Sequence, residues 1–566
     1  MASGKIGTLP KGLIVALLAA LVYLPGIGGV RLFDWDEINF AESAREMLVT
    51  GDWFNVQINF ESFWEKPPLF IWMQALSMKV FGVGEFAARF PNAVCGMLTL
   101  LLLFRIGRHL KDDRFGILWA RMYCCSLLPS FYFKSGIIDP WFNLFIFSGI
   151  YLFYKYTEHP CAKYAASSAA AIGLGILTKG PVAFLIFALT FFVQLCFRKF
   201  KLDFRWKDVA LYIAVLSIVG GMWFIALAIA GRGDVIIDFI EYQIRLFETG
   251  DAGHGGFLLY HFVWLFFGCV PASIFALPAF LPENVRSERN AGVSGMLKWM
   301  LTAFWVVLIL FTIVKTKIVH YSSFCYFPLT FLAAWNADRI ISRKAEWHRW
   351  QSGLLIGIAC IYGIILTALT LFDSLKGRII PLIDDPFAVR CLEAESEWIG
   401  FEPAIGIVLI ICTAVFCARL RRNRRIGDFA ILAGGNLFFL VVTTICAVGE
   451  VEKYTQASAV DFFIGKQGED CYIIPVNYKS YAHYFYSDRQ PENRCDDYEF
   501  LTSQKLDKTC YFVLKHIDGD MDDFRKDVPD AELLYCKSGF AFWKREKPSD
   551  QVKAAPDKCG DAQIVQ

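Results

Sequence analysis

Apolar runs of about bilayer length recur along most of this 566-residue chain and constrain its fold more than any other feature. Hydrophobic residues make up 56% of the chain and charged residues only 19%. A bilayer core accepts helices of roughly 20 apolar residues, because it holds no water to satisfy the backbone. We therefore expect a polytopic α-helical membrane protein with about thirteen spans. They lie near residues 12–30, 88–104, 115–133, 141–157, 164–178, 181–197, 208–230, 257–280, 296–314, 321–338, 352–372, 403–418 and 428–449.

Lysine and arginine gather in alternate connections between these expected spans. By the positive-inside rule those connections are cytoplasmic, which places the N-terminus inside and the C-terminus outside. The short apolar stretch 67–82 carries Lys79 and is flanked by Pro and Gly, so we expect an interfacial helix there rather than a span. The net charge of +2 argues against a nucleic-acid partner, which needs a strong basic face. The basic connections hold Arg105, Arg108, Lys111 and Arg114; Arg198, Lys199, Lys201, Arg205 and Lys207; Arg339, Arg343 and Lys344; and Arg419, Arg421, Arg422, Arg424 and Arg425.

The composition changes after residue 451. Residues 1–451 are expected to form the membrane domain, with a first outer loop over 31–87. Residues 452–545 are polar, with short runs rich in Ile, Val, Tyr and Phe that are typical of strands, and predict a small extracytoplasmic α/β domain. Residues 546–566 are expected to be a disordered tail. Six cysteines on the expected outer side predict at least one disulfide, with buried free thiols as the alternative: Cys391, Cys471, Cys495, Cys510, Cys536 and Cys559.

The first outer loop concentrates charge beside the membrane. Asp36 and Glu37 follow the first span, and Glu65 and Lys66 precede a proline pair. Asp36 is also placed to cap a helix over 37–50 that Gly51 ends, so helix capping alone is an alternative explanation of the two acids. Asp139 stands in the next outer turn, where a charge is costly unless it is used or paired.

Basic residues gather on the same expected side, against the positive-inside bias: Lys66, Lys179, Arg245, Lys315 and Lys317. Each one alone is explained by a side chain that reaches the interface. As a group at the outer interface they indicate an anion site, and a lipid phosphate is the anion found at that depth. Acids and bases together therefore suggest group transfer from a phospholipid-like donor.

The motifs in this region resemble those of the bacterial aminoarabinose transferases and their relatives, which are GT-C membrane glycosyltransferases related to the dolichyl-phosphate-mannose protein mannosyltransferases. The matching patterns are DExxFAExxREMLxxGDW, NxExFxEKPPLxxW and FGxxEFAARxP, then Ile138–Pro140, Leu177–Pro181, the loop from Arg245 to His254 and KIVHYSSFCYFP at 317–328. The resemblance covers about residues 10–340. After His254 the chain departs from the family pattern with Gly255 and Gly256, which puts part of the acceptor or phosphate contact in doubt.

The resemblance implies an inverting transferase that moves a sugar from a polyprenyl (undecaprenyl) phosphate carrier to a cell-envelope acceptor such as lipid A. It implies a bacterial inner-membrane protein whose active site faces the periplasm. Asp36 would orient the acceptor or take its proton, supported by Glu37 and Asp139. The carrier phosphate would be held by Lys66, Lys179, Arg245, Lys317 and Tyr321.

Glu65 and His254 would ligate a zinc-like divalent metal near that phosphate. The alternatives are that Glu65 pairs with Lys66 and that His254 is a solvated loop residue. No nucleotide or redox cofactor is expected.

Two other functions compete with glycolipid glycosylation. A protein O-glycosyltransferase would share the fold, and a lipid flippase or transporter would also show many spans. Transporters usually carry ionisable sites at mid-bilayer in paired halves. Here the charges lie at one interface and no halves repeat, so transport is the less favoured hypothesis.

Overall fold

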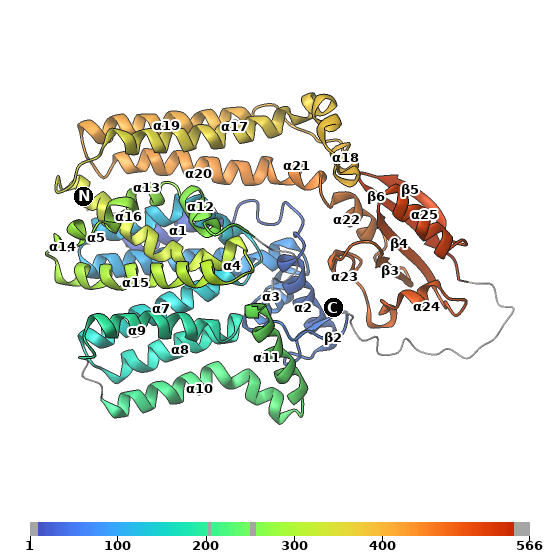
Figure 1. Ribbon diagram of the computed structural model, residues 1–566, viewed down its shortest axis with the longest axis horizontal. Coiled ribbons are helices and arrows are strands. Elements are labelled where there is room, and N and C mark those ends of the chain that lie inside the picture. The colour runs from blue at the N-terminus through green and yellow to red at the C-terminus, as the bar shows by residue number, and fades with distance from the viewer. Residues whose placement is uncertain (1–9, 202–204, 249–255, 548–566) are drawn as a thin grey trace, which may run out of the picture.

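The computed structural model describes residues 10–201, 205–248 and 256–547. Most of the chain forms an elongated bundle of helices, and the C-terminal residues form a sheet at one end of it (Figure 1). The bundle helices are α1 (Lys11–Tyr23), α2 (Asp36–Thr50), α3 (Leu69–Phe81), α4 (Glu85–Leu110), α5 (Asp113–Cys124), α6 (Leu127–Phe131), α7 (Asp139–Glu158), α8 (Ala162–Lys179), α9 (Val182–Phe197), α10 (Trp206–Ile229), α11 (Gly233–Glu248), α12 (Tyr260–Gly268), α13 (Ala272–Ala276), α14 (Pro282–Arg286), α15 (Ala291–Ile313), α16 (Tyr326–Ile341), α17 (Arg349–Ile379), α18 (Pro386–Leu392), α19 (Glu402–Arg422), α20 (Asp428–Cys446) and α21 (Val448–Lys453). Short 3-10 turns join them: η1 (Tyr132–Lys134), η3 (Leu277–Phe280), η4 (Val319–Cys325) and η5 (Ile380–Leu382).

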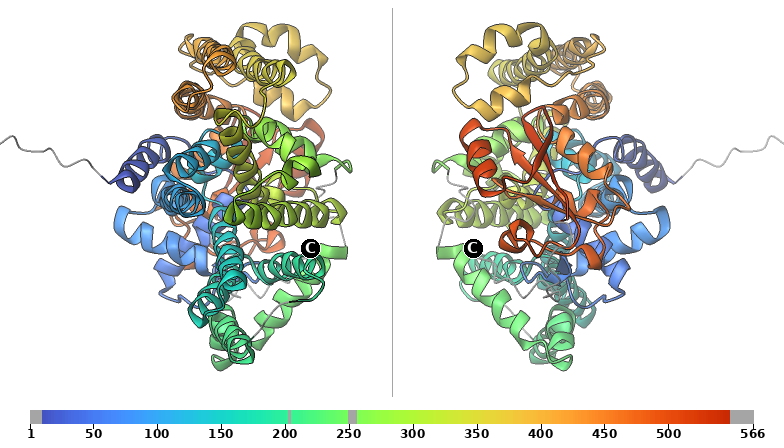
Figure 2. Two further views of the ribbon diagram at one scale, coloured as in Figure 1. Left: turned by 90° about the vertical axis from the view of Figure 1, so that its left-hand side faces the viewer. Right: turned by 90° about the vertical axis from the view of Figure 1, so that its right-hand side faces the viewer.

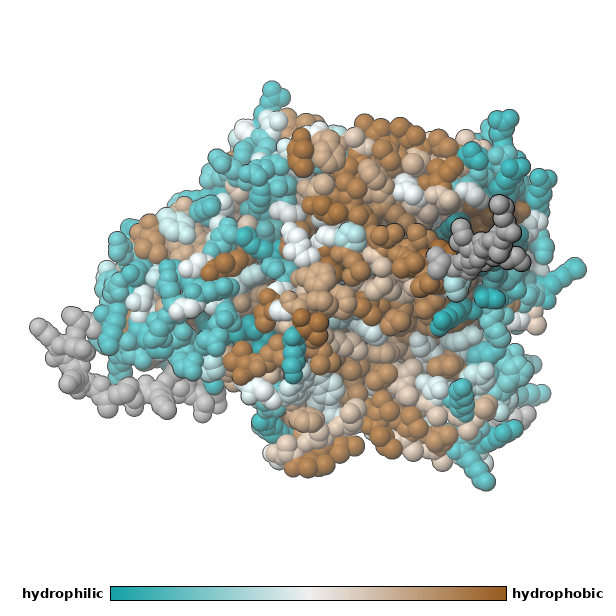
Figure 3. Space-filling model, turned by 180° about the vertical axis from the view of Figure 1, so that it is seen from behind, coloured by the Kyte–Doolittle hydropathy of each residue, from teal (hydrophilic) through white to brown (hydrophobic). Residues whose placement is uncertain are grey.

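A continuous apolar belt crosses the bundle between two hydrophilic ends (Figure 3). Within the described residues, six helices are long and apolar enough to cross a membrane, or up to eight if two bent pairs each count as one span. The bent pairs are Leu127–Lys134 with Asp139–Glu158, at 118°, and Tyr260–Gly268 with Ala272–Phe280, at 107°. The predicted polytopic helical architecture is thus present, whereas the count of about thirteen spans stays a prediction. Three shorter apolar helices also lie among the described residues: Lys11–Tyr23, Leu69–Phe81 and Val182–Phe197. The bend between η1 and α7 falls at the turn expected between the spans 115–133 and 141–157, whereas the α12–α13 break interrupts the span expected over 257–280.

The predicted basic connections meet at one end of the bundle. Lys111 and Arg114 both pair with Asp338, and Arg424 donates to the carbonyl of Ala345. The C-terminal sheet lies at the other end, together with α2 and α3, and we call this the site end (Figures 1 and 2). The polarity of charge is therefore the one that the sequence predicts, and the assignment of sides to the membrane stays a prediction.

The first predicted loop helix is α2, which differs from the expectation only at its start. It begins at Asp36 itself, and Trp35 occupies the N-cap position without a side-chain cap hydrogen bond. Asp36 is therefore not the cap, and its carboxylate is free of that local role. Gly51 ends the helix as predicted, with a φ of 72° that favours glycine. The two-stranded β1 (Gln57–Ile58) and β2 (Glu61–Ser62) follow, and α3 packs against both α2 and α4.

The C-terminal sheet has the strand order β3-β4-β6-β5, with β3 parallel to β4 and the other pairs antiparallel. Successive side chains of a strand point to opposite faces, so the sheet has two apolar surfaces. One surface, with Ile473, Val513 and Phe542, joins the apolar cluster of α2 and α3, and the other packs on α25. The elements are α22 (Ala457–Ile464), β3 (Cys471–Pro475), α23 (Ala482–Tyr486), η6 (Pro491–Asn493), α24 (Tyr498–Thr502), β4 (Thr509–Lys515), α25 (Asp518–Asp527), β5 (Glu532–Lys537) and β6 (Phe540–Arg545).

All sixteen cysteines in the described part of the chain are free thiols. The disulfide that the sequence predicts is therefore not formed among them, and Cys559 lies outside the described residues. Cys471, Cys495 and Cys510 are buried in the C-terminal apolar clusters, where a thiol packs as a small hydrophobic side chain.

Candidate functional site

Asp36 faces His320 across the site end of the bundle. The Nε2 atom of His320, on η4, lies 3.6 Å from a carboxylate oxygen of Asp36, whose side chain is 42% exposed. Burial lowers the pKa of His320, although the charges of Asp139 and Asp36 oppose the shift. His320 is therefore neutral near pH 7 and able to accept a proton or hydrogen bond. His320 lies within the KIVHYSSFCYFP motif, but its role was not predicted from the sequence, because a lone histidine in an apolar segment carries no specific local signal.

Asp139 and Lys179 form an ion pair beside this histidine. Asp139 begins α7 and Lys179 ends α8, and the ammonium lies 2.7 Å from one carboxylate oxygen. The other oxygen of Asp139 is buried, and no described residue hydrogen-bonds to it. The same ammonium lies 5.2 Å from the ring centre of Tyr321. The structure thus brings together three residues that the sequence predicts from distant motifs.

A second cluster of predicted residues surrounds Tyr242 on α11. The tyrosine hydroxyl donates to Glu65 at 3.2 Å, and the ammonium of Lys66 and the guanidinium of Arg245 lie 5.1 and 5.3 Å from its ring centre. The Nζ atom of Lys66 lies 4.0 Å from the Oε2 atom of Glu65, at the limit of an ion pair. Tyr242 was missed at the sequence level, since one aromatic residue in an amphipathic helix is usually a packing residue.

Two predicted site residues are engaged elsewhere. Glu37 is buried, and its carboxylate accepts from the guanidinium of Arg89 at 2.8 and 3.0 Å and from the backbone of Phe33 and Gly136. These partners hold the pKa of Glu37 below its usual range. The ammonium of Lys317 donates to three carbonyls at the end of α15, at 2.6 to 3.0 Å. This geometry favours a structural role for both, and their predicted catalytic and phosphate-binding roles stay predictions.

The predicted metal site is only half within the described residues. His254 lies outside them. Glu65 is described, but the part of the chain that the structure covers holds no cluster of three His, Cys, Asp or Glu side chains suited to a metal ion. A single carboxylate that already accepts a tyrosine hydroxyl does not by itself fit a divalent ion. The metal therefore stays a prediction, and no chemistry is assigned to it below.

The C-terminal segment closes over the start of α2. Asp34 accepts hydrogen bonds from the hydroxyl of Ser480 and the backbone of Tyr481, and burial raises the pKa of Asp34 to about 6. Trp35 and Tyr481 meet edge to face, with ring centres 5.6 Å apart. Burial raises the pKa of Tyr481, and the charges of Glu65 and Asp34 act in the same direction. The segment that the sequence left without a role therefore forms one wall of the site.

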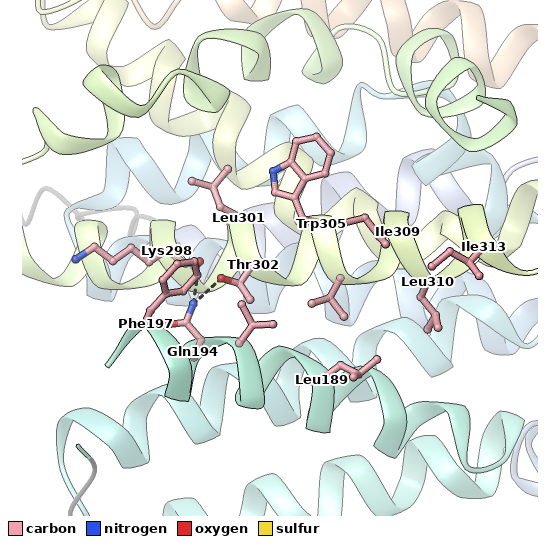
Figure 4. Close-up of a pocket in the computed structure, with 12 residues that line it drawn as sticks. Leu189, Gln194, Phe197, Lys298, Leu301, Thr302, Trp305, Ile309, Leu310 and Ile313 are labelled. Carbon is pink, nitrogen blue, oxygen red and sulfur yellow. Dashed lines mark hydrogen bonds between the residues drawn. The ribbon is translucent and has the colours of Figure 1, made fainter. Parts of the chain in front are cut away.

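An apolar groove of about 800 Å³ runs between α9 and α15 on the membrane belt (Figure 4). Its walls include Phe197, Ile309 and Ile313, which are 51 to 76% exposed in the absence of lipid. The only polar link across it in the close-up joins the amide of Gln194 to Thr302 at 2.7 Å and to the carbonyl of Lys298 at 3.1 Å. One end of the groove, at Leu310 and Ile313, adjoins the residues whose carbonyls bind Lys317.

The sequence of this chain is similar to one protein-family model and to several known proteins. The family model for dolichyl-phosphate-mannose-protein mannosyltransferase matches residues 65–223. The undecaprenyl phosphate-alpha-4-amino-4-deoxy-L-arabinose arabinosyl transferase of Pectobacterium atrosepticum is 29% identical over 76% of this chain and 75% of its own length. A protein of the same name from Pseudomonas fluorescens is 28% identical over 74% of this chain and 77% of its own length.

Solved structures show the same fold. The crystal structure of ArnT from Cupriavidus metallidurans bound to undecaprenyl phosphate matches with a TM-score of 0.76 and 18% identity, over 94% of this chain and 97% of that one. The archaeal oligosaccharyltransferase AglB from Archaeoglobus fulgidus matches with a TM-score of 0.50 and 12% identity, over 96% of this chain and 75% of that one. The GT-C fold expected from the motifs is therefore confirmed.

Proposed function

This chain is a GT-C membrane protein related to the aminoarabinose transferases, and on that premise we propose that it is an inverting glycosyltransferase. It takes a sugar from a polyprenyl phosphate carrier and transfers it to an acceptor in the cell envelope, such as lipid A. The relatives named above are undecaprenyl phosphate-dependent arabinosyl transferases, and the sequence similarity extends over about three quarters of the chain. The site end then faces the periplasm from the inner membrane.

The observation that carries this proposal is the group of cations that meets at the site end. Lys66 and Arg245 converge on Tyr242, and Lys179 lies across the site beside Asp139. Several cations from separate elements at one end of an apolar bundle suit a lipid phosphate, because that group keeps its negative charge at the interface. The apolar groove between α9 and α15 offers a path for part of the carrier's hydrocarbon chain.

Transfer breaks the bond between the anomeric carbon and the carrier phosphate, which leaves with the bonding electrons. An acceptor oxygen forms the new bond from the opposite face, with inversion. A phosphate leaving group needs its charge neutralised rather than a proton, and this is the role proposed for Lys66 and Arg245. Asp36 stands where the acceptor would approach, with the Nε2 atom of His320 3.6 Å from its carboxylate.

The role of Asp36 depends on the acceptor. If the acceptor is a hydroxyl, Asp36 takes its proton as a general base. If it is a phosphate, the attacking oxygen is already ionised, and Asp36 positions it through His320. The match of residues 65–223 to the protein mannosyltransferase model supports a protein hydroxyl as the alternative acceptor. The longer similarity to the arabinosyl transferases favours the glycolipid.

The decisive experiment supplies purified protein in detergent with undecaprenyl phosphate-aminoarabinose and with either a lipid A acceptor or an acceptor peptide. Mass spectrometry of both products identifies the acceptor, and the coupling constant of the new anomeric proton reports inversion. Failure to release carrier phosphate from any polyprenyl-phosphate sugar, together with solute uptake by vesicles that contain the protein, would favour a transporter instead.

A further inference from the structure

A second cavity has His320 in its lining and none of the residues of the Tyr242 cluster. It has a volume of about 290 Å³. Its walls come from the loop after α1, from η1 and from the junction of α20 and α21, and they include Phe33, Lys134, His320, Thr444 and Val448. Most of the lining is apolar, so a charged group inside it is conspicuous.

That charged group is Lys134. The residue is only 5% exposed, and its ammonium donates to the carbonyl of Pro25 at 2.6 Å. No described carboxylate forms an ion pair with it. The other two charged residues of the lining, Glu37 and Arg89, neutralise each other at 2.8 Å. The cavity therefore holds one uncompensated positive charge, which is costly at such burial unless an anion joins it.

The position of the cavity indicates which anion. Thr444 lies near the end of α20 and Val448 begins α21, so the cavity opens at the site end of a helix that crosses the apolar belt. Lys134 itself lies at the break between η1 and α7. Phosphates of lipid headgroups are the anions at this depth, and cations at membrane ends commonly bind them.

His320 connects this cavity with the reacting groups. Its ring is part of the cavity wall, while its Nε2 atom lies 3.6 Å from Asp36. An occupant that touches Lys134 on one side therefore reaches the Asp36–His320 pair on the other. The Lys66 and Arg245 cations lie with Tyr242, outside the cavity lining. The two substrates would then approach the same pair from two sides.

We propose that the cavity binds the phosphate of an anionic glycolipid acceptor, with Lys134 as its counter-ion. His320 lines this acceptor cavity and also borders the donor site. This inference rests on the proposed glycosyl transfer and assigns its acceptor subsite. The volume suits a phosphate with part of one sugar ring, so the remaining headgroup and the acyl chains stay outside.

The test compares acceptor kinetics of Lys134→Met with those of wild type, in detergent, with a phosphorylated disaccharide lipid and its dephosphorylated counterpart. We expect Lys134→Met to raise the KM for the phosphorylated acceptor by at least about tenfold, because a charge-assisted contact is lost. The KM for the polyprenyl-phosphate donor should not change. Lys134→Arg should restore part of the affinity.

A second variant avoids any change of charge. Val448→Trp fills the cavity from α21 and should raise the same acceptor KM. The matched control is Lys155→Met, at the opposite end of α7, where the ammonium lies 3.3 Å from the ring of His109. Native mass spectrometry of each variant with the phosphorylated lipid gives a binding readout that is independent of turnover.

The possible outcomes separate the two proposals. Unchanged acceptor KM and lipid binding in both Lys134→Met and Val448→Trp would overturn the cavity assignment while leaving the transferase intact. A rise in donor KM alone would overturn it as well, by assigning Lys134 to the carrier. Competition by millimolar inorganic phosphate without binding of the phosphorylated lipid would reassign the site to a free anion. Absence of turnover in wild type would instead contradict the proposed function.

Discussion

Two cations near the site, one on α2 and one in the loop before α3, are neutralised to different degrees. On α2, the guanidinium of Arg45 is 1% exposed and binds both oxygens of Glu42 at 2.7 Å, Asp488 at 3.0 Å and the carbonyl of Arg489 at 2.9 Å. In the loop, the ammonium of Lys66 is 16% exposed and has only Glu65, at 4.0 Å, as an ion-pair partner among the described residues.

The difference separates structure from function. A buried charge that the protein neutralises with several short hydrogen bonds holds two segments together, here α2 and the C-terminal segment. A charge with partners at the limit of contact keeps capacity for a ligand. The same contrast distinguishes Arg89, which Glu37 neutralises, from Lys134, which no described acid does.

Asp36→Asn tests the functional residues of the site and has the largest expected effect. We expect transfer to fall by about 10²- to 10⁴-fold, the range for loss of a general base or a positioning carboxylate. The thermal midpoint of unfolding should stay within about 2 °C, because Asp36 caps no helix and is 42% exposed. Asp52→Asn, in the same loop, is the control. Residual activity above about a tenth would leave Asp36 without a catalytic role.

Arg45→Met tests the structural contact between α2 and the C-terminal segment. Removing the guanidinium leaves the buried Glu42 carboxylate without a counter-ion, and this should cost about 3–5 kcal/mol of unfolding free energy. Chemical denaturation measures that loss, and limited proteolysis should show earlier cleavage within 457–545. Lys66→Met, the matched substitution at the site, should leave both readouts unchanged. Equal destabilisation by the two variants would remove the distinction drawn above.

Lys66→Ala should weaken the donor without unfolding the protein. Loss of one charge-assisted contact to the carrier phosphate is worth about 1.5–3 kcal/mol, which corresponds to a 10- to 150-fold higher donor KM. Lys79→Ala, an exposed lysine at the end of α3, should behave as wild type. A donor KM within twofold of wild type for Lys66→Ala would contradict the phosphate contact.

Local patterns predict the helices well and the pairings poorly. The helix after Asp36, its end at Gly51 and the strand at Cys471–Pro475 follow from propensity and turn residues that act over a few positions. The contacts of Glu37 with Arg89 and of Arg45 with Asp488 join residues 52 and 443 positions apart, and no local signal specifies them. The sequence therefore did not foresee that Glu37 is neutralised by Arg89, and its catalytic role stays a prediction.

Charge placement relative to the expected spans singled out Asp36, Asp139 and Lys179, and the resemblance to known motifs supplied roles for them. Three separate elements bring these residues to one place. The resemblance did not reach the C-terminal segment, and so the contact of Tyr481 with Trp35 was not foreseen. The break after α12 also escaped prediction, because hydropathy averaged over a window does not register a bend within an apolar run.

The smallest predicted effect concerns how pH acts on the same interface. His483 on α23 is 1% exposed, lies 3.9 Å from the ring of Tyr484, and has no hydrogen-bond partner among the described residues. Burial lowers its pKa well below the usual range; the charge of Arg489 acts in the same direction and that of Asp496 opposes it. The unfolded C-terminal segment binds this proton more tightly than the folded one does. Docking, the packing of residues 457–545 against α2, is therefore fully stable above about pH 6.5. Below that pH the free energy of docking weakens by about 1.4 kcal/mol per pH unit.

Asp34 acts with the opposite sign. Its pKa is raised to about 6, so the docked state binds that proton more tightly, and docking gains stability as pH falls through about 6 toward 4. His483→Phe, which keeps an aromatic ring against Tyr484, should therefore abolish the weakening below pH 6.5, whereas Asp34→Asn should deepen it. Hydrogen exchange of residues 457–545 at pH 7.5 and 5.5 measures both. Faster exchange at pH 5.5 in His483→Phe, equal to that of wild type, would assign the pH response to another group.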